Sequence, residues 1–291
     1  MKIAYIILCH KNPQQVQGLI QQLDNGKNDF YLHIDKKANK NDFLFSQENI
    51  FYVAEEDRED IKWASIQMVS ATIKLMSLVK KQNREYDYVI LLSGQDFPIK
   101  TNAEIENCLK ENKGFNFIEV LSHKDKNYKR YLKRNTIVYY NWMYKYSFIA
   151  RMLKKLYILL TGGYNHTFPV FRRKNKFNFD FEFGSQWWAF TYDCFAWILN
   201  YIEDHPEIYH YYEKAITADE SFFQTIYMLS PYKDKRKDKL TYLEMGRNHP
   251  KTFIETDFEL LSARKSELFA RKFDIDVDSE IIEKIKEKIT S

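Results

Sequence analysis

Residues 2–37, KIAYIILCHKNPQQVQGLIQQLDNGKNDFYLHIDKK, decide the fold class of this chain. The first eight of them form an apolar run of strand length, which a polar turn with Asn12 and Pro13 separates from QQVQGLIQQL, a pattern typical of a helix. A second strand-like run, FYLHIDKK, follows and ends at Asp35. A strand, a helix and a strand in this order predict an α/β domain with a parallel sheet.

The alternation of strands and helices continues to about residue 100. NIFYVAEE predicts a third strand, KWASIQMVSATIKLMSLVKK an amphipathic helix, and YDYVILLSGQDFPIK a fourth strand. Ligands of such sheets bind at the carboxyl ends of the strands, which places Cys9, His10 and Asp35 at the expected nucleotide edge. The chain contains neither GxGxxG nor a Walker sequence, which argues against a dehydrogenase or a P-loop kinase.

Composition and the number of cysteines indicate the cellular compartment of the protein. Three cysteines without metal-like spacing, Cys9, Cys108 and Cys194, fit a reducing compartment. The apolar start, IAYIILC, is too short for a signal peptide, and no apolar run approaches the length of a transmembrane helix. We therefore expect a cytoplasmic protein. Aromatic residues make up 16% of the chain, and aromatic-rich surfaces suit ligands such as sugars.

A basic segment, about residues 124–176, stands apart from the rest of the chain. It contains fourteen Lys or Arg and one acid, Asp125, and therefore carries +13, which leaves −9 for the remainder of a chain of net charge +4. Its core, SFIARMLKKLYILL, predicts a helix with one apolar face. One interpretation is peripheral docking on an anionic membrane at the inner face of the cell membrane. The other is a helix packed on the protein's own core, with its cations solvated or facing an anionic acceptor.

The stretch TADESFFQTIYM contains two adjacent acids, Asp219 and Glu220. Thr217 is a plausible N-cap, with Glu220 three places later as in a capping box, and apolar residues at helical spacing follow from Phe222. On this pattern alone the acids favour a structural role at a helix N-terminus. Evidence for a catalytic role of these acids has to come from other motifs in the chain.

Five stretches together resemble one family: HIDKK, LSGQDFPIKT, FGSQWW, ADESFFQT and LFARKFD. Each motif alone is weak, but their order along nearly the whole chain resembles the core-2/I-branching N-acetylglucosaminyltransferase family, which includes the peptide O-xylosyltransferases. The resemblance implies a GT-A-type fold with a Rossmann-like, mostly parallel sheet. It also implies a single domain over residues 1–291, with a nucleotide-binding half (1–110) and an acceptor and catalytic half (111–291).

The resemblance implies an inverting transfer from a UDP-sugar. Glu220 would be the base that takes the proton of the acceptor hydroxyl, and Asp219 would position it. No DxD motif is present where a metal would be held, and the family resembled uses cationic side chains in place of a metal. The matching cations are Arg271 and Lys272, with Lys251 as a third candidate. We therefore expect neither a metal nor a cofactor, and an acidic run, DIDVD, favours a turn over a metal site.

Further positions match substrate contacts of the family. Asp35 would contact the uridine, with His10, Trp63, Ala64 and Ser65 around the base and ribose. The acceptor side would include Asp96, Glu119, Lys124, Gly184, Ser185, Trp187, Trp188 and Tyr242. Core packing is the alternative for the two tryptophans. The match is weakest between residues 125 and 180, so the acceptor, a glycan or a lipid-linked sugar, is the part least transferable from the family.

N-Acetylglucosamine is the expected donor sugar, and xylose or another hexose is the alternative. A different class of function also fits the basic aromatic segment, namely a non-catalytic protein that binds carbohydrate or nucleic acid. The acidic remainder and the set of Asp35, Glu220, Arg271 and Lys272 favour the enzyme, because nucleic-acid binding does not require them. We therefore expect no nucleic-acid partner.

Overall fold

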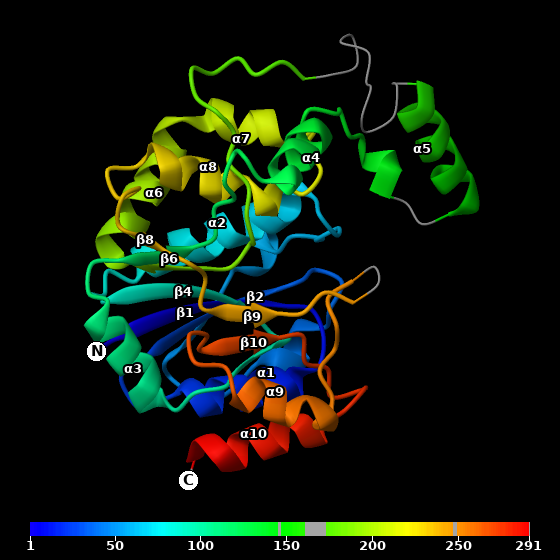
Figure 1. The fold of residues 1–291 in the computed structure, drawn as a ribbon. Helices are drawn as coiled ribbons and strands as arrows, with labels where there is room; N and C mark the ends of the chain where they lie inside the picture. Colours follow the sequence, from blue (N-terminus) through cyan, green and yellow to red (C-terminus); the bar gives the residue numbers. More distant parts are fainter. Residues whose placement is uncertain (145–146, 161–172, 247–248, 291) are drawn as a thin grey trace.

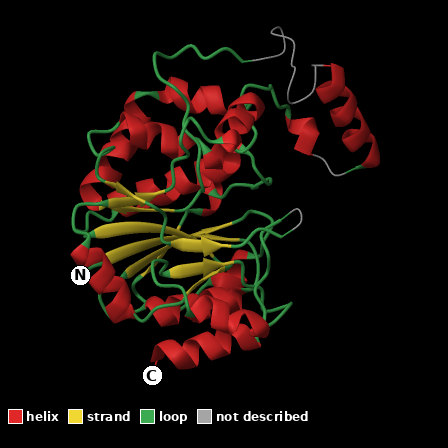
Figure 2. Ribbon diagram, in the orientation of Figure 1, coloured by secondary structure: helices red, strands yellow, loops and turns green. Residues whose placement is uncertain are grey.

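The computed structural model describes residues 1–144, 147–160, 173–246 and 249–290. Among these residues, a seven-stranded sheet with the order β3-β2-β1-β4-β7-β6-β8 lies between two layers of helices (Figures 1 and 2). Its strands are β1 (Ile3–Cys9), β2 (Asp29–Ile34), β3 (Ile50–Tyr52), β4 (Tyr88–Ser93), β6 (Asn116–Ile118), β7 (Trp188–Thr191) and β8 (Arg236–Lys237). Only β7 runs antiparallel to its neighbours, β4 and β6. The predicted α/β class with a mostly parallel sheet is confirmed.

The central strand, β1, explains the two layers. It is buried along its whole length and pairs in parallel with β2 and β4, so that Ile6 lies opposite Tyr31 and Leu91. Because successive strand side chains point to opposite faces, Ile6 joins one hydrophobic cluster and Ile7 joins the other. Each fully buried aliphatic side chain contributes about 1.5–3 kcal/mol to folding.

The helices divide between these two faces (Figure 1). One face is covered by α2 (Ile66–Lys81), α6 (Tyr192–Asp204), α7 (Pro206–Tyr212) and α8 (Phe222–Leu229). The other is covered by α1 (Pro13–Leu23), α3 (Asn102–Glu111), α9 (Phe258–Ser262) and α10 (Glu280–Thr290). Two further helices, α4 (Lys126–Asn135) and α5 (Phe148–Leu160), belong to the basic segment. Within the described ranges, none of the helices combines the length and the apolar composition needed to cross a bilayer.

The predicted fourth strand is two strands in different sheets. The chain leaves the main sheet after Ser93 and forms β5 (Asp96–Pro98), which pairs with β10 (Phe269–Arg271), and β10 pairs in turn with β9 (Thr241–Leu243). Asp96 is thereby opposite Arg271 in the antiparallel register. The turn at Gly94 and Gln95 interrupts the apolar run, and this interruption is where the sheet changes.

The helix expected to begin at Thr217 begins later. Thr217 has a left-handed backbone (φ 55°) and makes no side-chain cap; its hydroxyl donates to the carbonyl of Ile216 instead. A short 3₁₀ turn, η5 (Ala218–Glu220), follows, and α8 starts only at Phe222. The predicted capping box is therefore wrong, and the two acids lie on a turn rather than in the first turn of a helix.

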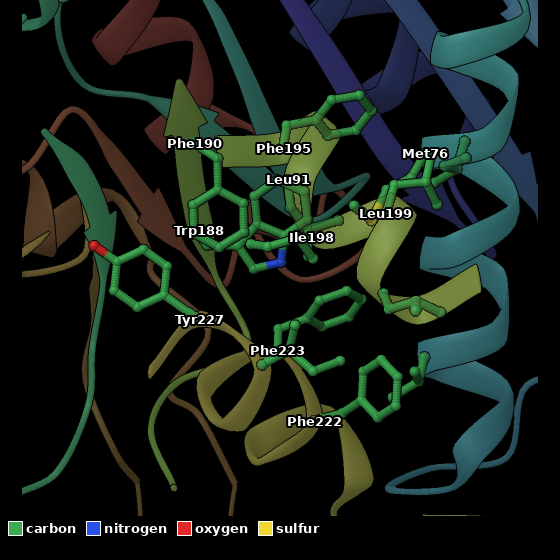
Figure 3. Close-up of a cluster of buried hydrophobic side chains, with 14 of the residues drawn as sticks. Met76, Leu91, Trp188, Phe190, Phe195, Ile198, Leu199, Phe222, Phe223 and Tyr227 are labelled. Carbon is green, nitrogen blue, oxygen red and sulfur yellow. The ribbon is translucent and has the colours of Figure 1, made fainter. Parts of the chain in front are cut away.

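Aromatic side chains fill the core between the sheet and α8 (Figure 3). Trp188 on β7 stacks on Phe190 at 4.3 Å between ring centroids, and Phe190 stacks on Tyr227 at 5.6 Å. Phe223 of α8 packs against the same indole at 5.7 Å. The structure thus places Trp188 in the core, and this corrects the expectation that it lines the acceptor side.

Candidate active site

A cavity of about 430 Å³ opens at the carboxyl ends of β1, β2 and β4, beside the end of β10. This is where ligands of parallel sheets bind. Its lining comprises Leu8, Cys9, His10, Asp35, Lys37, Ile61, Trp63, Met68, Ser93, Gln95, Gln186, Trp187, His249, Pro250, Arg271 and Lys272. A more open depression at the other end of the strands contains Lys2, Asp29 and Arg84, whose charges pair with one another. The cavity at the carboxyl ends is therefore the candidate site.

One wall of the cavity is a guanidinium held from two sides. The Nη1 atom of Arg271 lies 3.3 Å from a carboxylate oxygen of Asp96, and its guanidinium carbon lies 4.1 Å from the ring centre of Trp187. Asp96 in turn accepts hydrogen bonds from the backbone and the hydroxyl of Ser93. Contacts on both sides restrict the rotamers of Arg271, so the position of its positive charge is fixed before any ligand binds.

Asp96 itself does not face the cavity. It is 0% exposed, and burial raises the pKa of its carboxyl group, while the neighbouring Arg271 opposes that shift. The structure therefore places Asp96 beneath Arg271 and outside the cavity lining, and this corrects the expectation that Asp96 contacts the acceptor. Its contact helps to fix the position of the Arg271 guanidinium.

Lys272 adds a second cation beside the first. Burial and the charge of Arg271 lower the pKa of the Lys272 ammonium. Among the residues that the structure describes, Lys272 has no carboxylate within ion-pair distance. Lys251, the third cation proposed for the diphosphate, is different, because its ammonium lies 2.6 Å from Asp257 and outside the cavity lining. The site thus presents two adjacent positive charges that an anionic ligand would stabilise.

The cavity lining also includes Asp35 and His10. Asp35 is buried and accepts a hydrogen bond from the backbone of Lys37, whose ammonium lies 3.2 Å from the same carboxylate. Partial burial and the charge of Lys272 lower the pKa of the His10 imidazole, although the residue keeps an exposed surface. A neutral imidazole can both donate and accept a hydrogen bond. Both residues line the cavity at the carboxyl ends of β1 and β2, the edge where the sequence predicted them.

Of the three residues at the start of α2, only Trp63 faces the cavity. Its side chain is 64% exposed and lies in the lining. Ala64 is buried with a left-handed backbone (φ 59°), and the hydroxyl of Ser65 donates to the carbonyl of Lys62. The structure therefore places the side chains of Ala64 and Ser65 away from the cavity, where they hold the loop that presents Trp63.

Backbone hydrogen bonds tie the turn with Glu220 to this cavity. The carbonyl of Glu220 accepts from the amide of Gly184 at 2.9 Å, two residues before the cavity residue Gln186. The amide of Thr217 donates to the carbonyl of Ala64 at 2.8 Å, beside Trp63. The half-buried Glu220 is thus anchored beside the segments that carry Trp63 and Gln186, while neither Glu220 nor Asp219 is part of the cavity lining itself.

Gly184 lies where no larger residue fits. A β-carbon at this position would lie 1.9 Å from the carbonyl oxygen of Glu119, which is a backbone atom and cannot swing aside. We expect Gly184→Ala to destabilise the protein by about 1–3 kcal/mol or more, because the two segments must separate. The midpoint of thermal unfolding should fall by several degrees.

Gly18, in the middle of α1, supplies the matched control for that substitution. The nearest atom to a β-carbon there is the Nζ of Lys286 at 3.5 Å, an ordinary contact. Gly18→Ala should stabilise the protein by about 0.5–1 kcal/mol, because alanine loses less conformational freedom in a helix. Equal midpoints for Gly184→Ala and the unchanged protein would contradict the close approach.

The other residues proposed for the acceptor are dispersed. Glu119 pairs with Lys239 and accepts from the amide of Ser185 at 2.7 Å, so it supports the Gly184 segment. Lys124 is exposed on the loop after β6. Tyr242 lies against Phe253, under the guanidinium of Arg264, and outside the cavity lining. The structure does not bring Lys124 or Tyr242 into the cavity.

Several lining residues had no role in the sequence prediction: Lys37, Ser93, Gln95, Gln186 and His249. Lys37, Ser93 and Gln95 lie at or just after the ends of β2 and β4, inside motifs already singled out, so their position at a strand end was an available signal. Gln186 and His249 carry no such local signal, since loops bring them to the site. Across the described part of the chain, no group of three His, Cys, Asp or Glu side chains is arranged to hold a metal ion.

A sequence profile of the Core-2/I-Branching enzyme family matches residues 3–265 of this chain. A beta-1,3-galactosyl-O-glycosyl-glycoprotein beta-1,6-N-acetylglucosaminyltransferase of Homo sapiens is 26% identical over 95% of this chain and 67% of its own length. The form numbered 4 in Danio rerio is 30% identical over 40% of this chain and 28% of its own length. Xylosyltransferase 2 of Rattus norvegicus is 23% identical over 97% of this chain and 33% of its own length.

The chain thus spans about a third or less of the length of several curated relatives that it matches. Among solved structures, the WbbM bifunctional glycosyltransferase in its apo form has a TM-score of 0.38 at 12% identity, over 92% of this chain and 45% of that chain. Mouse xyloside xylosyltransferase 1, also in its apo form, has a TM-score of 0.38 at 10% identity, over 93% of this chain and 97% of that chain.

Proposed function

The chain belongs to the Core-2/I-Branching enzyme family, whose matched members are glycosyltransferases, and on this premise we propose that it transfers a sugar from a UDP-sugar to a hydroxyl group of a glycan or glycolipid. We propose a GT-A-type enzyme that inverts the anomeric carbon and needs no metal. The observation that carries the proposal is one cavity whose lining combines two cations, Arg271 and Lys272, with His10 and Asp35. A nucleoside diphosphate presents matching groups, because its phosphates are anionic and its nucleoside offers hydrogen-bonding edges.

The proposed reaction is a single in-line displacement. The acceptor oxygen forms a bond to the anomeric carbon as the bond from that carbon to the β-phosphate oxygen breaks. Glu220 takes the proton of the attacking hydroxyl, and UDP leaves with the electron pair of the broken bond. Arg271 and Lys272 stabilise the negative charge that develops on the diphosphate. Asp219, on the same turn, would position Glu220.

N-Acetylglucosamine is the proposed donor sugar, since several of the relatives are named as N-acetylglucosaminyltransferases. Xylose is the alternative, because Xylosyltransferase 2 of Rattus norvegicus matches over 97% of this chain. A screen of UDP-sugars for hydrolysis, measured as release of UDP, decides between them. We expect the fastest release from UDP-N-acetylglucosamine, and release from none of the sugars would contradict the proposed function.

Binding measurements separate the enzyme from a nucleic-acid-binding protein. UDP should raise the midpoint of thermal unfolding, since a ligand that binds only the folded state stabilises it. An RNA oligomer at the same concentration should leave the midpoint unchanged. The reverse result would favour the basic segment as a nucleic-acid-binding surface.

Turnover should not depend on a divalent metal. We expect sugar transfer at an unchanged rate in excess EDTA, because the two cationic side chains take over the charge stabilisation that a metal would supply. The measurement is the initial rate of UDP release with and without the chelator. If EDTA abolishes transfer and Mn²⁺ restores it, the roles given to Arg271 and Lys272 must be revised.

A further inference from the structure

Helix α5 carries an apolar face that nothing else in the described chain covers. Phe148 is 75% exposed and Leu159 is 71% exposed. The same helix exposes five more large apolar side chains, Ile149, Met152, Leu153, Leu156 and Leu160. At 100° per residue these seven side chains fall within an arc of about 140°. An uncovered face of this size marks an interaction surface, because single exposed apolar residues are normal but contiguous groups are not.

The opposite face of α5 is the one that holds it to the protein. Ala150 is buried, and Tyr157 and Ile158 pack on a small hydrophobic cluster. The buried members of that cluster are Ala64, Ile137, Tyr139, Met143 and Ile216. The predicted alternative, a helix packed on the protein's own core, therefore describes one face only. The exposed face needs a different occupant.

The charges around this face identify the occupant. Arg151 and Lys155 are exposed beside the apolar arc, and with Phe148 and Met152 they form a groove of about 320 Å³. Residues 124–176, which include α5, carry +13. A second copy of this chain would bring the same positive charge against it. An anionic lipid surface instead offers phosphates to the cations and acyl chains to the apolar face.

We propose that α5 docks in the plane of an anionic lipid bilayer through the face formed by Phe148, Ile149, Met152, Leu153, Leu156, Leu159 and Leu160. The docked helix remains close to the active site, because the hydrophobic cluster on which it packs contains Ala64 and Ile216. These two residues are the chain neighbours of Trp63 and Thr217. Figure 1 shows α5 projecting from the body on the side where β1 ends. A lipid-linked acceptor would thus meet the cavity at the membrane surface; this last step rests on the proposed function, whereas the docking does not.

Flotation of the full chain with lipid vesicles tests the proposal. The protein should float with vesicles of phosphatidylcholine and phosphatidylglycerol, less with phosphatidylcholine alone, and less as salt rises. Reversing two cations, in the double variant Arg151→Glu and Lys155→Glu, should lower the partition coefficient by at least ~30-fold, because each cation near an anionic surface contributes to binding. The control is Lys233→Glu with Lys235→Glu, an equal change of charge at exposed sites outside the segment.

A second double variant, Phe148→Ser with Leu159→Ser, tests the apolar half of the proposal. Both side chains are largely exposed, so the fold should persist, as circular dichroism can verify, while flotation is lost. Flotation that is unchanged in this variant would show simple electrostatic adsorption and overturn the docked helix. A protein that floats with no vesicle mixture would also overturn it, and a dimer in light scattering that this variant abolishes would identify a second copy as the occupant. UDP release needs no lipid, so failure of docking is distinguishable from failure of the proposed reaction.

Discussion

Glu220→Gln should lower the rate of sugar transfer by about 10²–10⁴-fold, the usual contribution of a general base. Glutamine keeps the shape of the side chain but cannot accept the proton of the attacking hydroxyl. The backbone carbonyl of Glu220, which accepts from Gly184, is unchanged, so the turn and the affinity for UDP should be preserved. Initial rates with donor and acceptor measure the first effect, and calorimetric titration with UDP measures the second.

Two further carboxylates serve as controls for that substitution. Asp219→Asn should cost less than Glu220→Gln, because we assign Asp219 to positioning rather than proton transfer. Glu203→Gln on α6 removes a surface carboxylate that pairs with Lys80 and should leave the rate unchanged. A Glu220→Gln variant that transfers sugar at nearly the original rate would show that another group is the base.

Lys272→Ala should weaken UDP binding by about 10- to 100-fold, in line with the loss of a charged hydrogen bond. Lys272 is half-buried, and burial and the charge of Arg271 already lower the pKa of its ammonium. A diphosphate in the cavity would relieve this repulsion, so much of the affinity for UDP should depend on this side chain. Calorimetric titration with UDP gives the dissociation constant directly.

Lys251→Ala is the matched control, because the ammonium of Lys251 is occupied by Asp257 at 2.6 Å. Its affinity for UDP should equal that of the unchanged protein. Arg271→Ala is a less clean test, since it leaves Asp96 buried without its cationic partner, a change that typically costs about 3–5 kcal/mol of stability. If Lys251→Ala weakens UDP binding and Lys272→Ala does not, the diphosphate site has been assigned to the wrong lysine.

Local patterns predicted the residues at strand ends correctly. His10 and Asp35 follow β1 and β2 directly, and parallel strands bring their carboxyl ends to one edge of the sheet. The same local reasoning misplaced Trp188: both tryptophans are buried in one hydrophobic cluster, and of the two only Trp187 also lines the cavity. Trp188 begins β7 and stacks on Phe190, whereas Trp187 precedes the strand and packs against the guanidinium of Arg271 at the cavity.

The sequence by itself determined the α/β class, since the apolar runs and the helical spacing between them are local properties of the chain. It also determined that α5 has an apolar side and a basic side. Only the tertiary structure decided that Asp96 lies beneath Arg271 and that the ammonium of Lys251 pairs with Asp257. It also decided which face of α5 is exposed. Such outcomes depend on contacts between segments far apart in the chain. A side chain's local pattern is the same whether its partner is a substrate, a neighbouring carboxylate or water.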